Sequence, residues 1–264
     1  MKVVLFCGGL GTRLRDHSDT SPKSLVNIGA RPIIWHLMRY YAHYGHTEFI
    51  LCLGYRGHML REYFLNYNEA ISNDFTLSNG GRTVELHSRD LDDWRITFVD
   101  TGLHSNIGQR LLRARKYLGE EEMFLANYTD GLSDLPLELQ MEQFRNCDAV
   151  ASFAAVSNAQ SFHSVVLDSH GRVSRMGGLA SQELLINGGF FILRREIFEH
   201  INEGEELVEQ PFQRLIAAGK LLGFRWHGFW RCMDTFKDKI SFDRMEGSGD
   251  CPWMVWRRAG YEDP

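Results

Sequence analysis

The sequence lacks a membrane-spanning stretch, paired cysteines and long runs of one charge, and each absence argues against a class of protein. No stretch approaches the roughly 20 consecutive apolar residues that a membrane-spanning helix needs. The five cysteines are scattered and odd in number, and no two of them form a Cys-x-x-Cys pair. That pattern argues against a disulfide-built scaffold or a zinc motif and favours reduced thiols in a cytoplasm.

Long runs of one charge are missing as well. The net charge is −5 at pH 7, and acidic and basic residues are well mixed along the 264 residues. Proteins that bind nucleic acid or an anionic membrane usually concentrate basic residues on one face or in one run. The N-terminus has a short apolar stretch without a signal-peptide core or a cleavage site. We therefore expect a cytoplasmic globular protein that binds neither nucleic acid nor membrane.

Strands and helices alternate through the first half of the chain. A short apolar run at 3–7 predicts a buried strand, and the next helix is expected from Pro32 to Gly45. Asn79-Gly80 lies between two alternating runs, which predicts a β-hairpin. The remaining expected elements are strands at 49–53, 95–99 and 123–127, and helices at 57–67 and 108–118. This order is typical of a parallel-rich sheet with helices on both faces.

From about residue 136 the pattern becomes more mixed. Helices are expected near 194–202 and 208–218, together with strands at 148–156, 164–168, 172–176, 186–193 and 220–226. No repeat or low-complexity linker separates the halves, so we expect one domain over residues 1–264, with one sheet shared by 1–135 and 136–235. The tail at 236–264 carries Trp253 and Trp256, which indicates either a docked helix or an oligomer contact.

The first strand leads into a glycine-rich loop, GGLGTR at 8–13. Glycine lets backbone N–H groups approach a phosphate closely, and Arg13 adds a charged fork for its oxygens. The loop lacks the Lys-Ser/Thr ending of a Walker loop and the last glycine of a dinucleotide-binding turn. Lys23 follows a polar, turn-rich segment and is expected to meet the same phosphates. Taken alone, the loop also fits a turn without a ligand, and Lys23 also fits a surface lysine.

Two aspartates follow expected strands. Asp130 comes just after the strand at 123–127, and Asp234 follows the strand at 220–226. Carboxylates at strand ends gather at the carboxyl edge of a parallel sheet, where α/β proteins bind ligands. Mg²⁺ prefers one or two carboxylates together with substrate phosphates. Each aspartate alone fits a turn or a helix cap better than a metal site, and the pattern by itself leaves both interpretations open.

Several colinear motifs resemble the sugar-phosphate nucleotidyltransferase family over nearly the whole chain. The family signature GGxGTRL…KP is similar to GGLGTRL and PKSL here, and further counterparts are LGYRGHMLREYF, VDTG, QRLLRA, NYTDGLSDL, INGGFF, GFWRCMDTFKDK and PWMVW. The likeness is greatest to the cytidylyltransferase branch. It implies a three-layer α/β/α, Rossmann-like nucleotidyltransferase fold with a mixed, mostly parallel central sheet.

The activity that the resemblance implies is transfer of a nucleotidyl group, from CTP, onto a sugar 1-phosphate such as glucose 1-phosphate. The attacking phosphate needs no general base, because the second pKa of a phosphomonoester is near ~6. Catalysis would then rest on positioning and charge neutralisation. Family members assemble, so a homo-oligomer is expected.

The resemblance also assigns roles to individual residues. Asp130 and Asp234 match the family's Mg²⁺ ligands, Arg13 would hold the leaving pyrophosphate, and Lys23 would meet the charge on the α-phosphate. Nucleotide contacts are implied for Gly8, Gly9, Gly11, Thr12, Arg13, Lys23, Ser105, Arg110 and Thr129.

Sugar contacts are implied for Asn187 and, more weakly, for Glu209. Each has an ordinary structural interpretation too: Asn187 in a turn, Glu209 at a helix start, and the nucleotide-side Arg110 as a solvated helix residue.

The match to the family breaks mainly on the acceptor side. The family has a Glu-Lys-Pro stretch before INGGFF whose lysine holds the sugar phosphate, whereas residues 174–185 contain no lysine and offer Arg175 instead. The family's RFG is SFH at 161–163, KP is Lys23-Ser24, and YGDG is YTDG with Thr129 at the glycine position. Two alternatives therefore stay open. They are cytidylyl transfer onto another phosphate or phosphonate, and a non-catalytic nucleotide-sugar binding protein.

Overall fold

The computed structural model describes residues 1–8, 21–91, 93–157, 163–167, 172–178 and 184–257, with backbone alone at 163–167 and 174–178. Eight strands form its central sheet. In spatial order they are β13 (Leu185–Asn187), β10 (Ala151–Ser157), β14 (Phe191–Arg194), β8 (Met123–Tyr128), β1 (Val3–Phe6), β4 (Glu48–Leu53) and β7 (Arg95–Asp100), while β15 (Leu221–Trp226) pairs with β10.

Parallel and antiparallel pairs both occur in this sheet. β1 runs parallel to β4 and β8, β4 to β7, and β10 to β15. β14 is antiparallel to β8 and to β10, and β13 is antiparallel to β10. Strands from both halves of the chain thus form one mixed sheet, as the sequence predicts.

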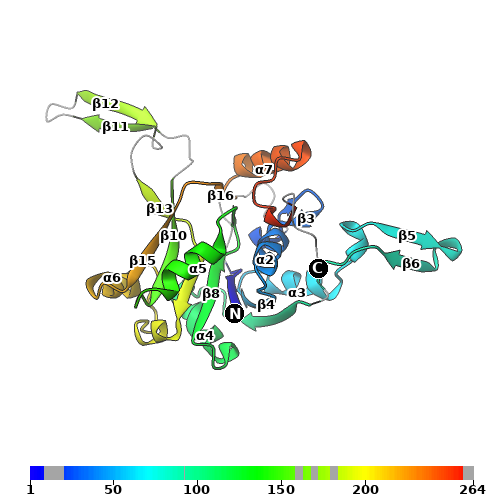
Figure 1. Cartoon of the computed structure of the whole chain (residues 1–264), viewed down its shortest axis with the longest axis horizontal. Coiled ribbons are helices and arrows are strands. Elements are labelled where there is room, and N and C mark those ends of the chain that lie inside the picture. Colours follow the sequence, from blue (N-terminus) through cyan, green and yellow to red (C-terminus); the bar gives the residue numbers. More distant parts are fainter. Residues whose placement is uncertain (9–20, 92, 158–162, 168–171, 179–183, 258–264) are drawn as a thin grey trace.

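Helices cover both faces of the sheet, because apolar side chains alternate along each buried strand. Val3 and Leu5 of β1 lie in one apolar core together with α2 (Ile33–His43), α3 (Gly57–Leu65) and α5 (Leu137–Arg145). Val4 and Phe6 lie in the opposite core with α4 (Ile107–Leu118) and α6 (Gln210–Ala217). The fold is therefore a three-layer α/β/α arrangement (Figure 1), which confirms the expected fold class.

Two hairpins project from opposite ends of the molecule (Figure 1). One consists of β5 (Phe75–Ser78) and β6 (Thr83–Leu86), and its turn holds Asn79 and Gly80 at φ values of 52° and 65°. The expected hairpin at Asn79-Gly80 is confirmed, since these two residue types tolerate the left-handed backbone. The other pairs β11 (His163–Leu167) with β12 (Val173–Gly178).

The expected strand at 186–193 is wrong as a single element. It is split into β13 and β14, because Gly189 has a φ of +77° and Phe190 turns with it. The Phe190 N–H donates to the side-chain Oδ1 of Asn127 on β8 at 2.9 Å, which holds the break in place. The helix expected near 194–202 is likewise only a 3-10 helix, Arg195–Glu199.

The C-terminal tail is docked on its own chain. It forms α7 (Phe236–Ser248) and a 3-10 helix, Val255–Arg257, and Trp253 between them is buried. The Trp253 ring packs edge-on against Phe242, and its Nε1–H donates to Nδ1 of His36 on α2 at 3.4 Å. The structure contains the docked helix, and an oligomer contact at this tail stays a prediction. In the described part of the chain, no helix is long and apolar enough to cross a bilayer.

Candidate active site

Four parallel strands end at one edge of the sheet. The strands are β1, β4, β7 and β8, and the chain continues from them into Gly8, Gly54, Thr101 and Thr129 respectively. Because the strands are parallel, these four turns lie on the same side of the molecule. The expected site therefore has its structural basis at this edge.

Asp130 and Asp234 reach this edge through a small two-stranded sheet. β9 (Gly131–Ser133) pairs antiparallel with β16 (Trp230–Cys232), and the register sets Gly131 opposite Cys232. The N–H of Met233 donates to the Asp130 carbonyl at 2.7 Å, which brings the two aspartates together. Asp234 follows the strand at 220–226 along the chain, as the sequence predicts, and β16 lies between the two.

Lys23 lies between the two carboxylates. Its Nζ donates to Oδ2 of Asp130 at 2.7 Å and also to Oδ1 of Asp234. The three side chains are 16%, 33% and 28% exposed, so the cluster is open to a ligand. Burial alone lowers the pKa of Lys23, but the two carboxylates outweigh that effect and raise it. Lys23 is therefore an ammonium ion held by two aspartates.

The two carboxylates fit a divalent cation. They converge on one nitrogen atom, which shows that oxygens from both can contact a single positive centre. Among the described residues there is no cluster of three or more His, Cys, Asp or Glu that would enclose a metal. Mg²⁺ suits such a site, since it takes one or two carboxylates and fills its remaining positions with phosphates and water.

The Arg110 side chain hydrogen-bonds to the chain at the ends of three strands, β1, β4 and β7. Its side chain is buried and donates to the Gly8 carbonyl at 3.0 Å and the Leu53 carbonyl at 3.1 Å. It also donates to Oγ1 of Thr101 at 2.7 Å. Burial lowers the pKa of this guanidinium. The interpretation of Arg110 as a solvated helix residue is wrong, because α4 turns this face towards the sheet.

Gly8 packs directly on that guanidinium. A Cβ at this position would lie 2.1 Å from the guanidinium carbon of Arg110, so a side chain cannot be added without displacing the arginine. The start of the glycine-rich loop is thus fixed by a close backbone approach.

The remaining expected contact residues are held more locally. The Ser105 hydroxyl donates to the Thr101 carbonyl and accepts from Arg113. Asn187 closes its own turn, accepting from the Gly189 N–H at 2.9 Å. Glu209 is exposed at the start of α6.

Some expected residues cannot be placed. Four residues of the glycine-rich loop and the side chain of the proposed lysine substitute lie outside the described residues: Gly9, Gly11, Thr12, Arg13 and Arg175.

Three residues near the edge were missed by sequence reasoning. Glu206 accepts from the N–H of Ile107 at the start of α4, and burial raises its pKa. Its only signal is an acidic residue in the run GEELVEQ, from which sequence reasoning singled out Glu209 alone. The other two are Cys7, which no motif distinguishes, and Ser24, whose signal is its departure from the family's KP.

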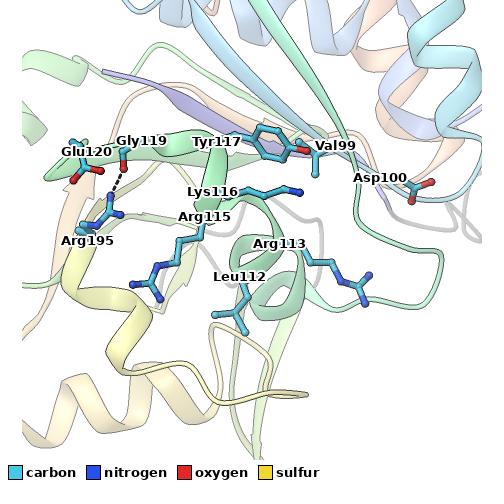
Figure 2. Close-up of a pocket in the computed structure, with 10 residues that line it drawn as sticks. All are labelled: Val99, Asp100, Leu112, Arg113, Arg115, Lys116, Tyr117, Gly119, Glu120 and Arg195. Atoms are coloured by element: carbon cyan, nitrogen blue, oxygen red, sulfur yellow. Dashed lines mark hydrogen bonds between the residues drawn. The ribbon is translucent and has the colours of Figure 1, made fainter.

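A cavity of about 720 Å³ lies along α4 and the residues after it. Figure 2 shows its basic side chains Arg113, Arg115 and Lys116 pointing in different directions. Arg195 on its rim donates to the Gly119 carbonyl, as the dashed line marks. These side chains do not converge on one point, so the cavity has no geometry of a reaction site.

Comparison with known proteins agrees with the geometry at the strand ends. The family model described as Nucleotidyl transferase matches residues 2–235. Glucose-1-phosphate cytidylyltransferase of Salmonella typhi is 34% identical over 257 residues, covering 97% of this chain and 100% of that protein. Probable glucose-1-phosphate cytidylyltransferase of Bacillus subtilis is 35% identical over 258 residues, with the same coverage.

Solved structures share the fold at low identity. A UDP-glucose pyrophosphorylase complexed with UDP-glucose superimposes with a TM-score of 0.66 at 16% identity, covering 94% of this chain and 98% of that chain. An inositol-1-phosphate CTP transferase from T. maritima gives a TM-score of 0.64 at 15% identity, covering 97% and 96%. With the family model matching residues 2–235 and relatives similar along their full length, the chain belongs to the nucleotidyl transferase family.

Proposed function

We propose that the chain transfers a cytidylyl group from CTP onto a sugar 1-phosphate, with glucose 1-phosphate as the first candidate. Pyrophosphate is released and a nucleotide sugar is formed. The observation that carries this proposal is the convergence of Lys23, Asp130 and Asp234 at the edge where the glycine-rich loop begins. The full-length similarity to glucose-1-phosphate cytidylyltransferases supports the choice of base and acceptor.

The chemistry follows from the charges at this edge. An oxygen of the acceptor phosphate attacks the α-phosphorus of CTP, and the bond from the α-phosphorus to the bridging oxygen of pyrophosphate breaks. Asp130 and Asp234 would hold Mg²⁺, which when bound neutralises charge on the triphosphate. The Lys23 ammonium stabilises negative charge that builds on the α-phosphate. No side chain has to remove a proton, because the acceptor phosphate is already mostly ionised.

The glycine-rich loop is proposed to hold the triphosphate. Gly8, fixed by Arg110, sets the start of the loop, and Arg13 is kept as the partner of the leaving pyrophosphate. Ser105 and Thr129 remain proposed contributors to the nucleotide side.

Acceptor choice is assigned to the second half of the chain. Asn187, Glu209 and Arg175 are kept as its candidate contacts, and Asn187 lies at the end of β13, which pairs with β10. Because residues 174–185 lack the family's lysine, transfer onto a different phosphate or phosphonate is the second candidate function. The fold accommodates such variety, since one solved neighbour is an inositol-1-phosphate CTP transferase.

One assay tests the proposal. Pyrophosphate release is measured with Mg²⁺, each of the four nucleoside triphosphates, and a panel of phosphorylated acceptors. Turnover with CTP and glucose 1-phosphate alone supports the first candidate, and turnover with CTP and another acceptor supports the second. Nucleotide binding without release across the panel overturns both and indicates a non-catalytic binding protein.

Location and assembly stay proposals of the same kind. All five cysteines are free thiols, which is typical of a reducing cytoplasm. We propose a homo-oligomer by analogy with the family, and light scattering of the purified chain tests it.

A further inference from the structure

Two buried hydroxyl groups bond to each other beneath the site. Oγ of Ser24 lies 2.7 Å from Oγ1 of Thr129, and the two residues are only 3% and 5% exposed. Oγ1 of Thr129 also donates to the Phe6 carbonyl at 3.2 Å. A hydroxyl donates only one hydrogen bond. The Ser24 hydroxyl is therefore the donor in this pair, and Oγ1 of Thr129 is the acceptor. The result is a directed chain of hydrogen bonds from Ser24 through Thr129 to Phe6.

Each member of this chain is next to a site residue or to the glycine-rich loop. Ser24 follows Lys23, Thr129 precedes Asp130, and Phe6 ends the strand that leads into Gly8. These hydrogen bonds therefore connect the same two segments that the ion pair of Lys23 and Asp130 connects. Residues 24 and 129 are 105 positions apart, so this contact exists only through the tertiary fold.

Cys7, between Phe6 and Gly8, is buried as well. Its thiol donates to the Leu5 carbonyl at 3.5 Å, and burial raises its pKa while Thr129 and Ser24 oppose that rise.

Both hydroxyl residues stand where the family signature has other residue types. The signature places proline and glycine at these positions, and neither has a side chain that donates or accepts such a bond. Two departures that look independent along the sequence are thus one feature in space.

We propose that Ser24 and Thr129 form a positioning pair that holds Lys23 and Asp130 in register for nucleotidyl transfer. The proposal rests on the function proposed above. Removing the Thr129 hydroxyl leaves the Ser24 hydroxyl buried without this partner, and removing the Ser24 hydroxyl takes away the hydrogen bond that Thr129 accepts. Both changes are unfavourable and shift the neighbouring backbone. A shift of about 1 Å between reacting groups lowers a rate by about 100-fold, so a smaller shift is expected to matter.

A double-mutant cycle tests the pair. Ser24→Ala and Thr129→Val each lower kcat about tenfold, while KM for the acceptor stays within about twofold. Because the two residues act as one unit, the double variant is expected to be no worse than the poorer single variant. Thr129→Ser, which keeps the hydroxyl, restores most of kcat.

Ser152→Ala is the matched control. Ser152 is buried on β10 and accepts from Gln140 at 3.5 Å, away from the strand-end edge. We expect this variant to lose thermal stability and to keep its kcat. Losses that multiply in the double variant, an equal loss of kcat in Ser152→Ala, or full kcat in both single variants would overturn the proposal.

Crystal structures of the free protein separate this inference from the proposed function. In the double variant the contact of Lys23 Nζ with Asp130 is expected to lengthen or break, and in Ser152→Ala it stays as in the wild type. If the wild type transfers no nucleotide at all, the proposed function fails, but this distance still tests the pair. An unchanged contact in the double variant overturns the pair whatever the activity.

Discussion

The strand-end edge around Lys23 and the region around Asn187 differ in how their polar side chains are held. At the edge, bonds join segments far apart in the sequence: Lys23 with Asp130 over 107 positions and Arg110 with Gly8 over 102. Around Asn187, the hydrogen bond that closes the turn spans two positions. Glu209 stands exposed at the start of α6.

This difference in hydrogen bonding affects which side chains can be replaced by a single substitution. A side chain bonded to several remote segments cannot be replaced alone, because each lost bond leaves a buried polar group unpaired. A side chain bonded to its own turn changes without such a consequence. Two of the departures from the family signature, Ser24 and Thr129, lie at the edge, and these two are paired with each other.

The largest effect on activity is expected from removing a carboxylate at the strand-end edge. Asp130→Asn and Asp234→Asn are each expected to lower turnover by at least about 10³-fold, since charge neutralisation at the phosphates is lost. Both side chains are partly exposed, so the expected loss of folding free energy is only about 1 kcal/mol. Steady-state assays and thermal melts measure the two effects. Near-normal activity in either variant removes that residue from the proposed metal site.

The second-largest effect on activity is expected from replacing Arg110, whose guanidinium packs against Gly8 at the start of the glycine-rich loop. Arg110→Lys keeps the charge but cannot reach three acceptors at once, so kcat/KM is expected to fall about 100-fold. Arg113→Lys, on the same helix but bonded only near Thr101 and Ser105, serves as the control and is expected to lose less. Equal losses in the two variants would show that the tie to Gly8 has no special effect.

A smaller effect is expected on the acceptor side. Asn187→Ala is predicted to raise KM for the acceptor about tenfold and to leave KM for CTP within about twofold. The effect is small because the side chain bonds mainly within its own neighbourhood. Kinetics with each substrate varied in turn measure the split. A rise confined to KM for CTP would place Asn187 on the nucleotide side.

Lowering the pH is expected to have the smallest effect on activity, because the group that titrates, His36, contacts the docked tail. Burial lowers the pKa of His36 to about 4, whereas the unfolded chain keeps a value of about 6.5. The unfolded state therefore takes up the proton first as the pH falls below 6.5. This removes about 1 kcal/mol of stability by pH 5.5 and more as the pH approaches 4. Protonation also removes the acceptor for Trp253, so tryptophan fluorescence and melting curves report the change.

His36→Gln is the control for the acid effect, since glutamine bonds without titrating. Its stability is expected to depend less on pH, and the remaining slope belongs to His46, whose pKa burial also lowers to about 4. A pH dependence identical to that of the wild type would contradict the assignment to His36.

Local rules account for the elements that were predicted correctly. The strand at 3–7, the helix after Pro32 and the hairpin at Asn79-Gly80 each follow from apolar periodicity or turn chemistry within a few residues. The glycine-rich loop and the two aspartates were recognised from motifs of the same local kind.

What the sequence by itself determined is therefore the order of most strands and helices and the candidates Lys23, Asp130 and Asp234 for one sheet edge. The tertiary structure decided which of them touch. The pairing of β9 with β16 brought Asp234 to Asp130, the packing of α4 buried Arg110 under Gly8, and the close approach of Ser24 and Thr129 made two substitutions into one contact. Periodicity and turn preference act between neighbours along the chain. Hydrogen bonds between residues about a hundred positions apart depend on how complete layers pack, which no local pattern records.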